Sequence, residues 1–191
     1  MEIVFIRHAQ GEHTVRPPAS LQIPDPALTE TGIGQAAKLK ETLSLTSADA
    51  VIASPTRRTL QTASIWSEDV LCVKIVHPLV GPRMFPLLPP EFALPCDRSL
   101  SGETIRREFP HFEHAAHFAE HVWQYGINAL PDHSFHALAN EFVRWCQSLN
   151  KPRLYVVAHD GTIASYRRHI SGEALTRADF QGETGWHIMS I

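Results

Sequence analysis

Two short runs of apolar, β-forming residues at opposite ends of the chain place the strongest constraint on its fold. Residues 2–6 read Glu-Ile-Val-Phe-Ile, and residues 154–158 read Leu-Tyr-Val-Val-Ala. Runs of this length without polar alternation are typical of strands that are covered on both faces. Such strands occur mainly in parallel sheets that have helices on either side, so we expect an α/β layer fold.

The segments between these runs alternate between strand and helix signals. Further strands are expected at residues 50–53, 73–76 and 186–191. Thr29 is expected to cap one helix, and Ser54 with Pro55 to supply the N-cap and first-turn proline of another. A later helix is indicated by an apolar stripe at helical spacing, formed by Phe135, Leu138, Phe142, Trp145 and Leu149.

Length and composition favour one domain that spans residues 1–191. The chain has 191 residues, 43% of them hydrophobic, and its composition does not change sharply anywhere. Residues 78–95 contain six of the 14 prolines, which excludes a long helix or a central strand there. We therefore interpret residues 78–131 as a proline-rich lid or insertion.

The same stretch carries an apolar group and several arginines. Its apolar residues could roof an organic substrate, but packing of the connection onto the domain is the more common role of such residues; they are Met84, Phe85, Leu87, Leu88, Phe92 and Leu94. Arg83 and Arg98 could meet further acidic groups of a substrate, whereas Arg106 and Arg107 are expected to be solvated or paired.

Charge, hydropathy and cysteine content exclude several classes of protein. A net charge of −3 and a pI near 6.4 argue against non-specific nucleic-acid binding. No apolar stretch reaches the roughly 20 residues that span a bilayer, and a strand that starts at residue 2 leaves no room for a signal peptide, so we expect a cytoplasmic protein without membrane contact. Cys72, Cys96 and Cys146 are widely spaced and odd in number, which fits reduced thiols. The oligomeric state stays open, because no apolar surface stripe stands out.

Basic residues follow the strands at the places where ligands bind in open α/β sheets. Arg7 and His8 end the first run, His159 follows residues 154–158, and Arg58 lies in the first turn of the helix after Ser54. Carboxyl ends of parallel strands meet at one sheet edge, so these side chains are expected to face a common crevice. Arginines beside a helix N-terminus suit a dianionic phosphoryl group.

This arrangement can support phosphoryl transfer without a metal. The reaction needs positioning of the phosphoryl group and neutralisation of charge on its oxygens, which two guanidinium groups and a second imidazole can supply. His8 is then free to attack, because a neutral imidazole is a nucleophile. The expected reaction is a ping-pong hydrolysis through a phosphohistidine.

Four segments resemble the histidine phosphatases, also called the phosphoglycerate-mutase-like superfamily, in order and separation. They are residues 7–11 (Arg-His-Ala-Gln-Gly), 28–36 (Leu-Thr-Glu-Thr-Gly followed by Gln35-Ala36), 54–63 and 158–162. The resemblance covers residues 2–63 and 154–169. It implies that His8 is the phosphorylated nucleophile, that Arg7, Arg58 and His159 hold the phosphoryl group, and that the fold is a three-layer α/β/α sandwich with a mostly parallel central sheet.

The chain departs from the family pattern at three places around His8. Many members have Gly where Ala9 stands, Thr where Gly11 stands, and a phosphate-binding Asn where Thr14 stands. The resemblance therefore assigns Thr14 a substrate-binding role on position alone. The residues Gln10, Gly11 and His13 are more similar to one divergent subset of the superfamily.

The proton donor of the family is also missing from its usual place. It is commonly a Glu after the strand that follows the Arg58 helix, but residues 79–86 contain no carboxylate. Asp160 is our first candidate, because the acid phosphatases and phytases of the superfamily place a donor Asp directly after the matching histidine. The remaining candidates are Glu91, Asp97 and Glu103.

Metal and cofactor sites receive little support from the sequence. His111, His114, His117 and His121 recur at helical spacing, and His117 with His121 could chelate a metal, but histidines on a solvated helix are common. No glycine-rich dinucleotide motif or P-loop follows an expected strand, so we expect no cofactor.

The sequence thus predicts a metal-independent phosphatase whose partner is a small phosphorylated substrate. Phosphoglycerate-mutase-type phosphoryl transfer is one alternative, since such mutases share the core. A catalytically idle domain that binds a phosphorylated ligand is another, motivated by the missing glutamate.

Overall fold

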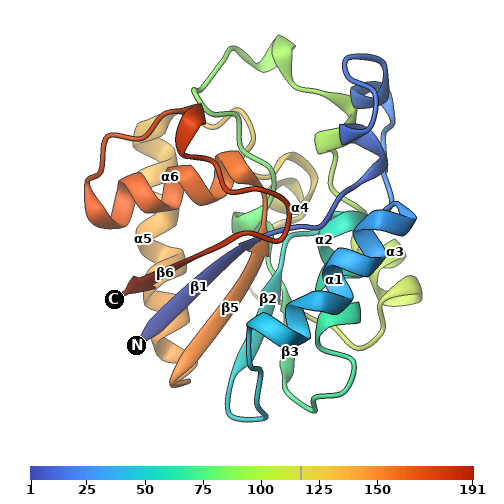
Figure 1. Ribbon diagram of the computed structural model, residues 1–191. Coiled ribbons are helices and arrows are strands. Elements are labelled where there is room, and N and C mark those ends of the chain that lie inside the picture. Colours follow the sequence, from blue (N-terminus) through green and yellow to red (C-terminus); the bar gives the residue numbers. More distant parts are fainter. Residues whose placement is uncertain (117) are drawn as a thin grey trace.

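The computed structural model of the protein, which describes residues 1–116 and 118–191, has one six-stranded sheet at its centre (Figure 1). The strand order is β4-β3-β2-β5-β1-β6. All pairs are parallel except β1 with β6. The strands are β1 (Glu2–Arg7), β2 (Ala50–Ala53), β3 (Val73–Val76), β4 (Glu113–His114), β5 (Arg153–Ala158) and β6 (Trp186–Ser190).

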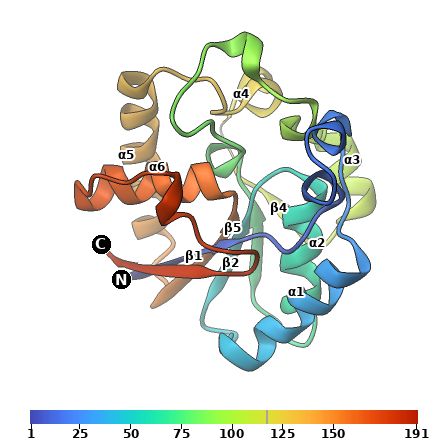
Figure 2. The ribbon, with the colours of Figure 1, turned by 45° about the horizontal axis from the view of Figure 1, so that its top comes forward.

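Helices cover both faces of the sheet and complete the expected three-layer α/β/α sandwich (Figures 1 and 2). One layer contains α5 (Asp132–Ser148) and α6 (Asp160–Ser171), with the short α4 (Glu120–Tyr125) beside it. The other layer contains α1 (Glu30–Thr42), α2 (Arg57–Trp66) and α3 (Gly102–Glu108). Among the described residues, no helix combines the length and apolar content that a membrane crossing requires.

The central strands are buried on both sides, as their apolar runs predicted. Successive residues of β1 point to opposite faces. Phe5 stacks on Tyr166 of α6 with ring centroids 5.5 Å apart, whereas Ile6 belongs to the cluster that contains Leu60 of α2. Each helical layer therefore has its own apolar core against the sheet.

One of the two expected helix caps is confirmed, and the other is wrong. The Oγ1 atom of Thr29 accepts the amide of Gly32 at 3.0 Å and caps α1. Helix α2 instead begins at Arg57 with Thr56 as N-cap, so Ser54 and Pro55 lie before it. Ser54 is fully buried and its hydroxyl group bonds to a histidine of the candidate site, which is why it is not a cap.

The proline-rich segment divides into two parts with different roles. Residues 78–98 contain only short 3-10 turns and cross above the carboxyl ends of the central strands (Figures 1 and 2). Residues 100–115 return to the core, where Ile105 of α3 and Phe112 are buried and β4 extends the sheet. Only the first part therefore covers the candidate site.

His77, directly after β3, is fully buried in an aromatic environment. Its ring centroid lies 4.9 Å from that of Phe118, 5.0 Å from Phe142 and 4.5 Å from Trp145. The Nδ1 atom accepts the amide of Leu79 at 3.2 Å, so the proton resides on Nε2. Burial lowers the pKa of His77 to about 3, and the imidazole is neutral in the folded protein near neutral pH.

We expect the free energy of unfolding to fall on acidification, in part because of His77. The unfolded histidine titrates near its ordinary pKa of about 6.5, so between that value and about pH 3 the unfolded state binds the extra proton. Stability from this group is complete above about pH 6.5 and is reduced by about 2 kcal/mol at about pH 5. Urea unfolding of His77→Phe at both pH values should show a decrease smaller by about that amount.

His133→Phe, which changes an exposed histidine of α5, is the matched control and should keep the wild-type pH dependence. An equal loss of stability on acidification in wild type and His77→Phe would contradict this account.

Candidate active site

His8 follows the last residue of β1 and is buried. Its Nδ1 atom lies 2.7 Å from the carbonyl oxygen of Ala9, and since a carbonyl can only accept, Nδ1 carries the proton. The Nε2 atom is therefore unprotonated and accepts from Nε of Arg58 at 3.3 Å. Burial, followed by the charge of Arg58, lowers the pKa of His8 well below its ordinary value. At neutral pH, this residue is a neutral imidazole whose unprotonated Nε2 is directed at Arg58.

Arg58, in the first turn of α2, links three parts of the site. Besides His8, its guanidinium group contacts Nδ1 of His159 at 3.2 Å through Nη2 and the carbonyl oxygen of Cys96 at 2.7 Å through Nη1. The side chain is almost completely buried. It forms an ion pair with Asp97, whose Oδ1 lies 3.5 Å from Nη2. The Arg58 cation is thus fixed beside the imidazole rings of His8 and His159.

His159 is the N-cap residue of α6 and lies next to His8, with ring centroids 5.2 Å apart. Because Nδ1 accepts from Arg58, the proton is on Nε2, which lies 2.9 Å from Oγ of Ser54 and donates to it. Burial, with the charge of Arg58, lowers the pKa of His159 well below its usual value. Sequence reasoning missed Ser54 as a partner of this ring because Ser-Pro before a helix is a common capping signal.

Arg7 and Asp160 form an ion pair at the edge of the site. The Nη2 atom of Arg7 lies 3.3 Å from Oδ2 of Asp160, and Nη1 donates to the carbonyl oxygen of Gln181 at 2.8 Å. The other carboxylate oxygen of Asp160 accepts the amide of Gly161 at 2.7 Å. Nε of Arg7 is buried without a hydrogen-bond partner among the described residues. One donor of Arg7 is therefore left unsatisfied by the described residues.

His13 is a third histidine of the site that sequence reasoning did not select. It lies on a 3-10 helix (Glu12–Thr14), it is buried, and its ring centroid is 5.3 Å from that of His8. Burial, with the charges of Arg58 and Arg7, lowers its pKa to about 3. Its Nδ1 has no partner within the described part of the chain. The signals in the sequence are the short spacing from His8 and the similarity of residues 10–13 to one divergent subset of the superfamily.

Thr14 also lines the site, but its hydroxyl group is engaged by the protein. Its Oγ1 atom donates to the carbonyl oxygen of Gly11 at 3.0 Å, and it also lies 3.2 Å from Oε1 of Glu183. The other carboxylate oxygen of Glu183 accepts from Gln35 at 2.9 Å. Thr14 therefore ties the N-terminal loop to the C-terminal segment.

These residues surround a cavity of about 470 Å³ at the carboxyl ends of β1 and β5. Its polar end is formed by the arginines, histidines and two carboxyl groups described above. Three segments supply the remaining wall, namely residues 13–21, 82–97 and 177–180. In Figure 1 they are the blue, green and orange-red segments at the top of the molecule. The cavity is much larger than the phosphoryl-binding end alone requires.

The four candidate proton donors occupy different environments. Asp97 and Asp160 line the cavity, whereas Glu91 and Glu103 are exposed and are not among the described residues of its wall. Burial raises the pKa of the Asp97 carboxyl group; the charge of Asp160 acts in the same direction, and Arg58 opposes both. Its surroundings thus favour the protonated form of the Asp97 carboxyl group.

The guanidinium group of Arg83 is held by other parts of the protein, although the sequence also allowed contact with a substrate. This group donates to the carbonyl oxygens of Ile127 at 2.9 Å and Leu130 at 2.7 Å and pairs with Asp132 at 2.7 Å. The carbonyl oxygen of Arg83 lies against α6, where a Cβ atom on Gly161 would come within 2.1 Å of it. Arg83 therefore anchors the loop that approaches the start of α6.

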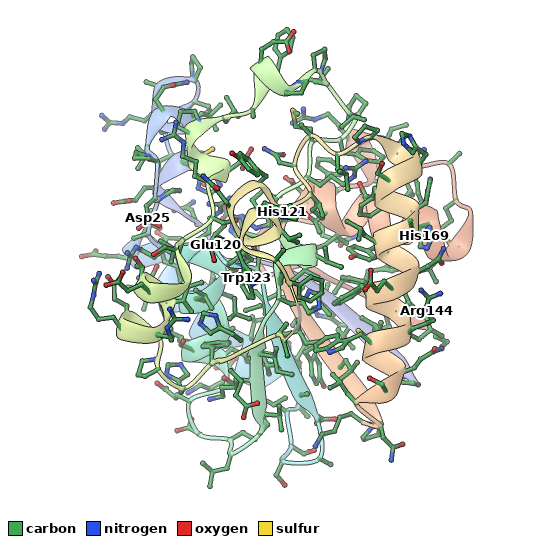
Figure 3. The ribbon with its side chains drawn as sticks, turned by 180° about the vertical axis from the view of Figure 1, so that it is seen from behind. Asp25, Glu120, His121, Trp123, Arg144 and His169 are labelled. Carbon is green, nitrogen blue, oxygen red and sulfur yellow. The ribbon has the colours of Figure 1, made fainter. Side chains whose placement is uncertain are left out.

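The histidines at 111–121 show no metal site in the part of the chain that the structure describes. No group of three or more His, Cys, Asp or Glu residues there could hold a metal. Nε2 of His111 bonds to Ser64 at 3.0 Å, His114 packs on Trp123 with ring centroids 5.2 Å apart, and His121 is exposed on α4 (Figure 3). The suggested chelate of His117 with His121 includes a residue outside the described ones.

Comparison with known proteins gives a family match over part of the chain and a fold for nearly all of it. Residues 3–79 match the family model described as histidine phosphatase superfamily, branch 1. No curated protein matches the chain significantly.

Solved structures with the same fold cover nearly the whole chain. An α-ribazole phosphatase from Shigella flexneri has 18% identity and a TM-score of 0.57, covering 100% of this chain and 91% of its own. A mycobacterial glucosyl-3-phosphoglycerate phosphatase has 19% identity and a TM-score of 0.61, covering 99% and 90%. The ecdysone phosphate phosphatase from Bombix mori has 11% identity and a TM-score of 0.65, covering 99% and 88%. This chain has the histidine phosphatase fold, and its residues 3–79 carry the sequence signature of branch 1 of that superfamily.

Proposed function

We propose that the protein is a phosphatase that hydrolyses a small phosphomonoester without a metal, through a phosphohistidine on Nε2 of His8. The observation that carries the proposal is the protonation pattern of this ring. Its Nδ1 proton is bound to a backbone carbonyl group, so Nε2 faces Arg58 and the cavity as a free base. A buried neutral imidazole in this tautomer is ready to attack phosphorus.

The first step transfers the phosphoryl group to the protein. The electron pair of Nε2 forms the N–P bond while the bond from phosphorus to the ester oxygen breaks, and that oxygen takes a proton from a carboxylic acid. In the second step, the resulting carboxylate takes a proton from water, and the oxygen of this water displaces His8 from phosphorus. Inorganic phosphate and the starting enzyme result, so atoms and charges balance.

Arg58 and Arg7 would neutralise the phosphoryl oxygens during both steps. The guanidinium group of Arg58 contacts both His8 and His159. It would therefore lie beside the equatorial oxygens of a phosphoryl group bound between these rings. Nε of Arg7 is a further free donor. A bound dianion also raises the pKa of His159, because negative charge favours the protonated ring, which can then donate to the phosphoryl group.

We infer that Asp97 supplies the proton and that Asp160 orients Arg7. Asp160 was the first candidate from the resemblance, but both of its carboxylate oxygens have partners, Arg7 and the amide of Gly161. Asp97 is instead half-buried beside Arg58 on the lid side of the cavity, and partial burial there raises its pKa. A protonated carboxyl group at that position suits a general acid.

The nucleophile is tested by trapping the intermediate. After a rapid acid-free quench of the protein with p-nitrophenyl phosphate, we expect mass spectrometry to locate one phosphoryl group on His8. His8→Ala should lose the adduct and at least about a thousandfold in kcat. His133→Ala, at an exposed histidine, is the control. Tight phosphate binding without an adduct or turnover would instead indicate the binding domain that the sequence left open.

Substitution of Arg58 tests its role, and the same substitution of the adjacent Arg57 is the control. Arg58→Lys keeps the positive charge but removes the fork that reaches His8, His159 and the carbonyl group of Cys96, so affinity for orthovanadate should fall at least about tenfold. Arg57→Lys is the matched control, since Arg57 binds Asp25 and Glu108 on the surface. Equal affinities of the two variants, measured by competitive inhibition, would contradict the assignment.

The proton donor is tested by the leaving group and by pH. Asp97→Asn should lower kcat/KM for ethyl phosphate about a hundredfold or more but affect p-nitrophenyl phosphate much less, because nitrophenolate needs little protonation. In wild type, activity on ethyl phosphate should fall as pH rises above the raised pKa of Asp97, because the acid form is lost.

This alkaline decrease in activity should be absent in Asp97→Asn. Asp160→Asn serves as the comparison and should affect both esters alike, through weaker placement of Arg7. If Asp160→Asn shows the dependence on leaving group and Asp97→Asn does not, the donor is Asp160.

A further inference from the structure

Much of the cavity wall is apolar, although the cavity also contains the strongly polar group of histidines and arginines. The segments that pass over the site contribute seven large apolar side chains to it, namely Leu21, Met84, Phe85, Leu88, Phe92, Leu94 and Phe180. We propose, on the basis of the phosphatase function above, that the substrate is a monophosphate of an apolar alcohol that carries no second anionic group.

Exposure of two apolar residues of this wall is the first observation that supports the proposal. Phe92 is 58% exposed and Leu88 is 45% exposed, yet both belong to the cavity wall. The sequence favoured packing of these residues onto the domain, but a packed residue would be buried. Large apolar side chains that border a concave site in this way are typical of ligand contact.

The distribution of cations is the second observation. Four arginines line the cavity, and Arg7 and Arg58 belong to its phosphoryl-binding end. Arg83 is held by two carbonyl groups and Asp132, and Arg177 is exposed, with its guanidinium carbon 5.7 Å from the centroid of the Phe180 ring. Within the described residues, no second cluster of cations faces the cavity. A second phosphate or carboxylate of a substrate would therefore meet apolar surface and lose hydration without compensation.

The wall also offers few groups that could bind hydroxyl groups of a sugar. Pro17, Pro82 and Pro86 lie among the apolar residues and have no amide proton to donate. The hydroxyl group of Thr14 already contacts Gly11 and Glu183. Sugars need several placed donors and acceptors, whereas an apolar alcohol gains simply from leaving water.

A homologous series of alkyl phosphates tests the proposal. Ethyl, butyl and hexyl phosphate have leaving groups of nearly equal basicity, so differences in kcat/KM report contact of the alkyl chain with the wall. Each added methylene can contribute up to about fourfold, and we expect hexyl phosphate to exceed ethyl phosphate at least tenfold. Glycerol 3-phosphate and 3-phosphoglycerate should not exceed ethyl phosphate.

Substitutions in the wall connect this preference to its residues. Phe92→Ser and Leu88→Ser change side chains that are already partly exposed, so the fold should be retained, and each should lower the hexyl-to-ethyl ratio at least about threefold. Leu71→Ser is the matched control, because Leu71 is 96% exposed and lies outside the cavity wall. This variant should keep the wild-type ratio.

The outcomes separate the substrate class from the proposed function. Turnover of p-nitrophenyl phosphate with a flat alkyl series, or with 3-phosphoglycerate as the better substrate, would overturn the apolar substrate and leave the phosphatase in place. An unchanged ratio in Phe92→Ser and Leu88→Ser would also overturn it. Absence of turnover and of a His8 adduct with every ester would overturn both.

Discussion

The parallel pairing of β1 with β5 is the constraint on which the site depends. Arg7 stands opposite Ala158 in this register, and the amide of His8 donates to the carbonyl oxygen of Ala158 at 3.0 Å. Two histidines from opposite ends of the chain are thereby brought to one level at one sheet edge. A slip of one residue in either strand would turn its side chains to the other face and separate the rings. Apolar burial of both strands prevents such a slip, so the core of the protein determines the geometry of the site.

A buried cation beside two neutral imidazole rings makes the site suitable for a phosphoryl group. Arg58 is buried, and Asp97, at 3.5 Å, is the carboxylate that the structure places beside it. A buried cation without full compensation costs several kcal/mol. Neutral His8 and His159 supply electron pairs but no negative charge, since their pKa values lie well below the usual range. The donors of Arg58, which are already in place, would stabilise the charge of a bound phosphoryl group.

Much of the fold and of the candidate site could be predicted from the sequence, because these features depend on local sequence patterns. Strands at 50–53 and 73–76 were predicted with the bounds that the structure has, since each is a short run of β-forming residues between turn signals. Arg7, His8 and His159 could be selected because the carboxyl ends of parallel strands meet in all open α/β sheets. The family resemblance then assigned the role of nucleophile to His8 and that of its partner to His159.

The remaining features depend on packing between segments that are distant in sequence. Ser54 reads as a helix cap, but its hydroxyl group bonds to His159, which is 105 residues away. Asp97 could be named only as one of several acids, because its position beside Arg58 follows from the path of a connection without regular structure. The exposure of Phe92 on the cavity wall also depends on that path.

The central claim is that hydrolysis proceeds by two displacements through His8, and the stereochemistry at phosphorus tests it most directly. A thiophosphate monoester made chiral with oxygen isotopes can be hydrolysed and the configuration of the released thiophosphate determined. Two in-line displacements, each with inversion, give overall retention. The account predicts retention; inversion would show direct attack by water and would contradict it.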